Sequence, residues 1–241
     1  MRRYIWAPLL LVACPQLAAQ DADAQAAGAA YDKLSAEYRT SYDAWMEKYR
    51  AASQAGEQKK AQQLIKEQPG PEFVDRFLAG AQKFAGTDGA LPFLIWSFQN
   101  SRDDTERDYV LSILSLDHVE SAQLDQVVPR ARNKAFLDRV IAKTPHDEVK
   151  AQAMYARANT VLGAEATDVA RKAAIADLVQ VKELTKDKRL AGRIDGVIFE
   201  AKNLAVGMAA PEIEAEDLDG VNFKLSDYRG KVVLLDFWGD W

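Results

Sequence analysis

The sequence has very little cysteine and histidine. Its 241 residues include one cysteine, Cys14, and two histidines, His118 and His146. A single cysteine cannot form an intramolecular disulfide, and a metal site needs several ligands at defined spacing. Each histidine lies in a different break between expected helices, without a neighbouring cysteine, so each is expected to be a turn or capping residue. We therefore expect no metal and no other cofactor.

Glycine-rich phosphate loops and a surplus of basic residues are absent as well. No Ser–His–Asp set has any support in the sequence either. There are 31 basic and 36 acidic residues, a formal net charge of −5, which excludes the basic surface of a nucleic-acid-binding protein. With 48% hydrophobic and 28% charged residues, the composition is that of a globular protein that can bury a core.

The first twenty residues have the order of a secretory signal. In MRRYIWAPLLLVACPQLAAQ, two arginines precede an apolar stretch that runs from Tyr4 to Ala13 and is too short to span a membrane. Residues 1–20 are therefore expected to be a signal peptide that is cleaved near Ala19. The protein is then exported, to the periplasm or the cell envelope.

Cys14 opens a second processing route. The letters LVAC resemble a lipobox, which would make Cys14 the lipidated first residue of a lipoprotein and its lipid the only attachment to a membrane. Under ordinary cleavage the mature chain has no cysteine at all, and it contains 29 basic and 36 acidic residues. An exported protein can use disulfides, but this one then has none to form.

Helical periodicity runs from Asp21 to about Leu204. One apolar stripe recurs at three, four and seven residues on a long expected helix: Tyr31, Leu34, Tyr38, Trp45 and Tyr49. Helical spacing of such a stripe predicts core packing rather than a ligand site. The letters QPGP at 68–71 break the pattern, and GTDG at 86–89 ends the helix that follows.

Six more segments, separated by short breaks, are each expected to form about one helix: 90–99, 106–116, 121–131, 133–143, 147–163 and 168–184. Capping residues mark several starts, namely Asp103, Ser121, and Thr144 before Pro145. The charge runs EQKKAQQ and KELTKDKR read as solvated helix faces. Serial helices with short loops predict an array of stacked hairpins over residues 21–204, similar to tetratricopeptide repeats but without their signature. Such an array could have either of two roles. It either offers a concave surface to partners, or it serves as a spacer or a dimer scaffold.

The character of the sequence changes at residues 205–241. Alternating apolar residues predict two extended pieces, joined by a turn at Asp219 and Gly220. LSDYRGK then predicts one helical turn that stops at a glycine. The continuous apolar run from Val232 to Leu235 predicts a strand covered on both faces.

This C-terminal segment resembles the opening of a redoxin domain, the thioredoxin-fold group that includes TlpA-like disulfide reductases and the AhpC/TSA peroxiredoxins. The matching elements are VGMAAPEI, DLDGVNFKLSDYRGK and VVLLDFWGDW. The ending DFWGDW is closer to the thioredoxins and TlpA-like proteins than to the peroxiredoxins. The expected fold is therefore mainly α, a helical-array domain followed by the first strands of an incomplete thioredoxin-like α/β domain.

The resemblance implies a redox site that directly follows Trp241. In the family the next residues are Cys-x-x-Cys, with the first cysteine activated at a helix N-terminus and the second resolving the mixed disulfide. It also implies a proton-relay role for Asp236 and an aromatic platform made by Trp238 and Trp241. The alternative is that Asp236 faces solvent or caps a loop and that the tryptophans are core residues.

Both cysteines of the motif are absent from the 241 residues, so the chain as written is expected to be a truncated, inactive fragment. One hypothesis is that a UGA codon for selenocysteine follows Trp241; a nonsense mutation, a frameshift or a contig edge are the alternatives. The intact protein is expected to exchange electrons with protein disulfides or a membrane electron donor, or else to reduce peroxides. The competing interpretation is a helical interaction protein whose redoxin tail is vestigial.

Overall fold

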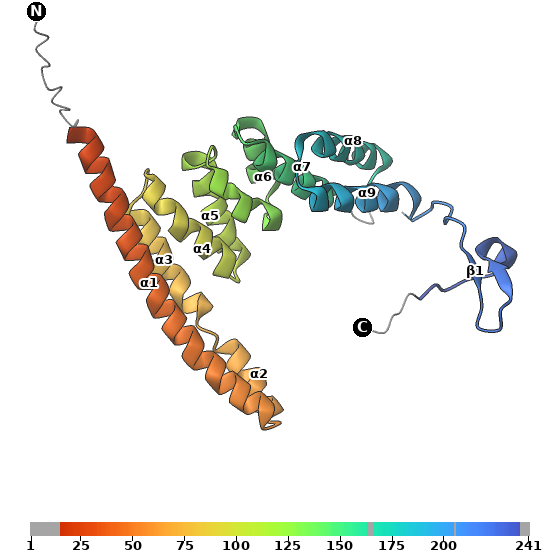
Figure 1. Cartoon of the computed structure of the whole chain (residues 1–241), viewed down its shortest axis with the longest axis horizontal. Helices are drawn as coiled ribbons and strands as arrows, with labels where there is room; N and C mark the ends of the chain where they lie inside the picture. The colour runs from red at the N-terminus through yellow and green to blue at the C-terminus, as the bar shows by residue number, and fades with distance from the viewer. Residues whose placement is uncertain (1–14, 163–165, 205, 237–241) are drawn as a thin grey trace, which may run out of the picture. The chain divides into compact units, whose positions relative to one another are not determined.

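The computed structural model describes residues 15–162, 166–204 and 206–236. This part of the chain is mainly α-helical, with a short two-stranded sheet near its C-terminal end, as expected (Figure 1). The chain divides into two compact units between Arg157 and Ala158, and this boundary falls inside helix α7 (Asp147–Val161). The expected domain boundary at 204/205, which rests on sequence character, stays a prediction. Within the described ranges, no helix is long and apolar enough to cross a membrane.

The first unit begins with a long helix, α1 (Pro15–Gln54), which starts inside the expected signal peptide. Residues 1–14, including Cys14, lie outside the described residues. Gly56, at φ 73°, occupies the left-handed conformation that commonly follows a helix end. The chain then returns along α1 as α2 (Gln58–Lys66) and, after the predicted QPGP break, as α3 (Gly70–Lys83) (Figure 1).

The remaining elements of this unit are η1 (Asp88–Ala90), α4 (Leu91–Asn100), α5 (Asp104–Asp117), η2 (Ala122–Gln126), η3 (Val128–Arg130) and α6 (Lys134–Lys143), followed by α7. Helix α3 packs against α1 and α4, and α5 packs between α4 and α6. The order and spacing of these helices agree with the periodicity of the sequence, with one exception described below.

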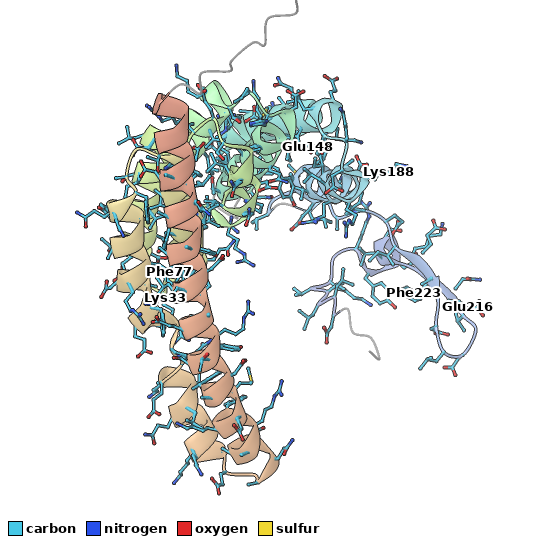
Figure 2. All side chains as sticks on the ribbon, turned by 60° about the vertical axis from the view of Figure 1, so that its left-hand side comes forward. Lys33, Phe77, Glu148, Lys188, Glu216 and Phe223 are labelled. Atoms are coloured by element: carbon cyan, nitrogen blue, oxygen red, sulfur yellow. The ribbon has the colours of Figure 1, made fainter. Side chains whose placement is uncertain are left out.

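Aromatic side chains hold α1, α3 and α4 together. Phe77 of α3 is fully buried and stacks on Trp96 of α4, with ring centroids 3.7 Å apart, and Figure 2 labels Phe77 where α3 runs along α1. Tyr38 of α1 meets Trp96 edge to face at 4.9 Å, and Tyr31 meets Phe93 at 5.3 Å. The α1 stripe is therefore core packing at these positions, as predicted, and such contacts add to the burial of apolar area.

The segment 121–131 was expected to be a helix but forms two short 3-10 turns, η2 and η3. Pro129 explains the difference, because it has no backbone N–H and restricts the conformation of the residue before it. Four side chains of the segment are nonetheless completely buried: Leu124, Val127, Val128 and Ala131. The apolar pattern therefore marked a core segment correctly, whereas its backbone conformation was wrongly predicted.

Two of the three predicted caps are confirmed. Asp103 accepts hydrogen bonds from the backbone N–H groups of Thr105 and Glu106 at the start of α5, and Ser121 caps η2. Thr144 instead follows the end of α6. Its hydroxyl accepts from the N–H of His146 at 3.3 Å. A cap at Thr144 would start the helix at Pro145, whereas α7 starts at Asp147, two residues later.

Asn133 offers a direct test of helix capping. Its Oδ1 accepts a hydrogen bond from the N–H of Phe136 at 3.0 Å, and its Nδ2 donates to Asp108 at 2.9 Å. We expect Asn133→Ala to lower the free energy of unfolding by about 1 kcal/mol, because α6 loses its N-cap. Asn133→Ser keeps a capping oxygen and is expected to recover most of that loss in urea unfolding. Equal losses for Ser and Ala would show that the Asp108 contact matters more than the cap.

The second unit contains a helical hairpin, α8 (Asp168–Leu184) and α9 (Lys188–Asn203). Thr167 and Asp187 cap the two helices, each by accepting a backbone N–H hydrogen bond. Buried apolar residues face each other along the pair, among them Leu178, Val181 and Ile194. The charge run KELTKDKR, expected on one helix face, spans the end of α8, the connection and the start of α9.

Candidate functional site

The C-terminal segment folds locally as a β-hairpin. Strands β1 (Glu214–Glu216) and β2 (Asn222–Lys224) are antiparallel, and Ala215 lies opposite Phe223. Glu214 and Lys224 lie directly opposite each other, and their side chains form an ion pair at 2.7 Å. Figure 2 labels Glu216 and Phe223 on the two strands. The two predicted extended pieces are therefore confirmed.

The hairpin turn is held by the side chain of Asp217. Its Oδ1 accepts hydrogen bonds from the N–H groups of Asp219 and Val221, each at 2.9 Å. Gly220 has φ 78°, a conformation that glycine adopts without steric cost. The turn predicted at Asp219 and Gly220 is therefore confirmed, and it fixes the register of the two strands.

A single 3-10 turn, η4 (Leu225–Tyr228), follows the hairpin and is tied back to it. The N–H of Leu225 donates to the carbonyl of Ile213 at 2.9 Å, and the N–H of Ser226 donates to Glu212 Oε1 at 3.0 Å. The hydrogen bond from the Ser226 side chain, followed by that from its backbone, lowers the pKa of Glu212 below its usual value. Gly230, at φ 83°, ends the turn as predicted. Residues 212–231 thus form a hydrogen-bonded scaffold that leads into the final segment.

The final apolar run is not the buried strand that its sequence predicts. Residues 232–236 have no regular secondary structure, and Val232 and Leu234 are almost completely exposed. A strand covered on both faces needs neighbouring strands for its backbone and other elements over its side chains. Among the described residues the only strands are those of the hairpin, which pair with each other.

The sequence-predicted site residues fall at this end of the chain. Asp236 is exposed in the structure, whereas Trp238 and Trp241 lie outside the described residues. The described part of the segment carries no thiol, and no group of three or more His, Cys, Asp or Glu residues within the described ranges could hold a metal ion. The roles assigned to Asp236, Trp238 and Trp241 stay predictions.

A second feature, which sequence reasoning missed, is the burial of His118. Both histidines sit at helix ends as expected: His118 ends α5, and the carbonyl of His146 accepts the first hydrogen bond of α7. His118, however, is only 5% exposed. Its Nδ1 lies 4.0 Å from Asp88 Oδ1, and its Nε2 has no hydrogen-bond partner among the described residues. Burial lowers the pKa of His118, and the neighbouring carboxylates of Asp117 and Asp88 only partly oppose this effect.

The lowered pKa of His118 predicts a loss of stability in mild acid. The unfolded chain binds a proton near the ordinary histidine pKa of about 6.5, whereas the folded chain binds it only at lower pH. The free energy of unfolding should therefore be highest above about pH 6.5 and fall as the pH drops towards the folded pKa. Urea unfolding across this range should show a smaller slope for His118→Gln than for the unmodified chain. His146→Gln, at the half-exposed histidine, is the matched control, and equal slopes for both variants would contradict the assignment.

Comparison with known proteins finds relatives that match a short stretch at the C-terminal end of the chain. This stretch is 50% identical over 42 residues to the thiol-disulfide oxidoreductase ResA of Geobacillus thermodenitrificans, and 52% identical over 42 residues to ResA of Geobacillus kaustophilus. In both cases the match covers 17% of this chain and 24% of the relative. ResA of Bacillus thuringiensis subsp. konkukian is 37% identical over 46 residues, 19% of this chain and 27% of the relative. The chain thus spans about a quarter of the length of these curated relatives.

No protein-family model matches the chain. No solved structure matches it either. The similarity to ResA is consistent with the resemblance inferred from the motifs, and it is limited to a short redoxin-like segment at the C-terminal end. The similarity leaves most of the helical part of the chain uncovered, because the matches span only 17–19% of the chain.

Proposed function

We propose that residues 205–241 are the opening of a thiol-disulfide oxidoreductase domain in an exported protein. The observation that carries the proposal is the 50–52% identity to two ResA proteins over 42 residues at the C-terminal end of the chain. The hairpin and η4 support it, because they form the turns and strands that the motifs predict immediately before the apolar run. Disulfide exchange on protein substrates, or with a membrane electron donor, is the activity proposed for the intact protein, and peroxide reduction is the second possibility within this class.

In this proposal the missing nucleophile directly follows Trp241. A cysteine or selenocysteine there would attack a substrate disulfide, and a cysteine three positions later would release the product from the mixed disulfide. Asp236 would move the proton of the resolving thiol, and Trp238 and Trp241 would form an aromatic surface beside the site. Since the sequence offers no cofactor motif, the reaction is proposed to need only thiol or selenol groups.

The alternative proposal is a helical interaction protein with a vestigial redoxin tail. The first unit has an extensive hydrophobic core of its own, whereas the hairpin of the tail contributes no buried residue. A tail that kept its motifs without its chemistry would then serve only for docking. The two proposals differ in one requirement, because only the enzyme needs a resolving cysteine, a further helix and a cis-proline loop downstream.

Genomic DNA downstream of the Trp241 codon tests the proposal. If the frame continues through Cys-x-x-Cys, or through UGA, two codons and a cysteine with a recoding hairpin nearby, the redox proposal is supported. The protein expressed from that longer frame should then reduce insulin with dithiothreitol, and replacing the resolving cysteine by serine should abolish turnover. A different stop codon, or UGA without coding sequence beyond it, would leave the helical interaction protein as the function.

A further inference from the structure

The first unit contains a pocket that the redox proposal does not use. It has a volume of about 350 Å³ and lies among α3, η1, α4 and α5. Its lining is mostly apolar, with Leu78 and Ala81 from α3, Leu94 from α4 and Ile113 from α5. This size and this lining are typical of small-molecule sites at the lower end of the usual range.

Small residues keep the pocket open. Ala79, Ala85 and Ala90 line it together with Gly86, where the neighbouring core positions carry phenylalanine and tryptophan. Gly86 has φ 76°, and a Cβ atom added there would meet no atom within 4 Å. Tyr109 of α5 also lines the pocket and is 58% exposed, an unusual degree for so large an aromatic residue.

The charged side chains that line the pocket are both acidic. Asp75 comes from α3 and Asp117 from the last turn of α5. Neither carboxylate has a hydrogen bond or an ion pair with the described residues, unlike Asp138, which pairs with Lys134 and Arg157. Among the described residues, no lysine or arginine lines this pocket, so they do not compensate its negative charge within it.

His118 lines the same pocket. Its side chain is only 3% exposed, and its Nε2 lacks a partner among the described residues. Nε2 itself has almost no accessible surface, so another part of the His118 side chain lines the pocket, and that part is in a position to report on what occupies it.

We propose that this pocket binds a small organic cation, an amine carried by an aromatic or branched aliphatic body. The apolar body fills the space among Leu78, Leu94 and Ile113, and the ammonium group lies near Asp75 and Asp117. The exposed ring of Tyr109, which lines the pocket, offers a cation–π contact to the ammonium group. Neutral His118 is compatible with a cationic neighbour, whereas an arginine or lysine at that place would repel it.

Nuclear magnetic resonance on the full chain tests the proposal with phenethylamine as the probe. The chain has two histidines, so the ring signals of His118 and His146 can be assigned by substituting either one. We expect phenethylamine to shift the His118 signal saturably and to leave the His146 signal in place. The neutral analogue 2-phenylethanol, of the same shape, should bind roughly fivefold or more weakly, because it lacks the charge.

Variants separate the contribution of charge from that of shape. Asp75→Asn and Asp117→Asn should each weaken binding of phenethylamine by roughly twofold to fivefold, the usual range for exposed ion pairs. Asp43→Asn, at an exposed position of α1 away from the pocket, should leave the affinity unchanged. Ala79→Phe, which places a large ring on the pocket wall, should abolish the His118 shift.

Three results would overturn the proposal. The first is the absence of a saturable shift at His118, and the second is equal affinity for the amine and the alcohol. The third is an affinity for phenethylamine that is unchanged in both aspartate variants. Thermal unfolding of each variant, compared with that of the unmodified chain, distinguishes loss of the site from loss of the fold. None of these readouts depends on redox activity, so failure here leaves the proposed function of the C-terminal segment untouched.

Discussion

Replacing Leu114 by alanine is expected to lower the free energy of unfolding of the helical unit by about 2–5 kcal/mol. Leu114 is completely buried in the hydrophobic core on α5. Truncating it removes apolar contacts and leaves a cavity that the surrounding helices fill only in part. Since domains of this kind are stable by about 5–15 kcal/mol in total, the substitution should remove a large share of the stability.

Leu116 provides the matched control on the same helix. Its side chain is 67% exposed, so Leu116→Ala makes the same chemical change with little change in burial. We expect its effect to stay within about 0.5 kcal/mol. Urea unfolding monitored by circular dichroism at the helix band gives both values. Similar losses for the two variants would mean that α5 is not packed as described, and that the pocket beside it is not defined by this core.

Most of the helical architecture could be predicted from the sequence, because each helix is specified by residues only a few positions apart. The Tyr31 and Tyr38 stripe on α1 and the glycine and proline breaks at 68–71 and 86–89 all correspond to features of the structure. Caps such as Asp103 were readable for the same reason, since a side chain and the backbone two or three residues away make the contact. Periodicity and capping need no knowledge of distant parts of the chain.

Features that depend on partners distant in sequence could not be predicted. His118 looks like an ordinary cap in the sequence, and its burial follows from packing of α5 near η1, whose Asp88 lies 30 residues earlier in the sequence. The pocket beside it likewise depends on alanines from α3, on η1 and on residues of α5 meeting in space. The 3-10 turns at 121–131 are a different case, because Pro129, which explains them, lies within the segment itself.

The C-terminal segment shows the same division between local and distant determinants. Its turn and hairpin form because Asp217, Gly220 and the opposed Glu214–Lys224 pair act within a few residues. The strand that should follow at 232–235 depends on neighbours that the described residues do not provide. Local motifs therefore form as the ResA-like sequence predicts, whereas the element whose stability comes from a complete sheet does not.

The second large effect concerns disulfide chemistry. The 241-residue chain is expected to show no dithiothreitol-dependent insulin reduction above the buffer blank. Its only cysteine, Cys14, lies in the expected signal peptide, and one thiol cannot both attack a disulfide and resolve the mixed disulfide that forms. Turbidity of precipitating insulin B chain measures the rate, with thioredoxin as the positive control.

A longer chain shows whether residues beyond Trp241 supply the disulfide chemistry. A protein that continues after Trp241 through Cys-x-x-Cys and the rest of the downstream frame should turn over insulin, and its resolving-cysteine→Ser variant should not. Asp236→Asn in that longer protein should reduce the rate most near neutral pH, because a proton relay matters only where the resolving thiol must be deprotonated. Turnover by the 241-residue chain itself would sink the assignment of the chemistry to residues beyond Trp241. A flat response to Asp236→Asn across pH would instead remove only the relay, and leave Asp236 as the solvent-facing residue that the structure shows.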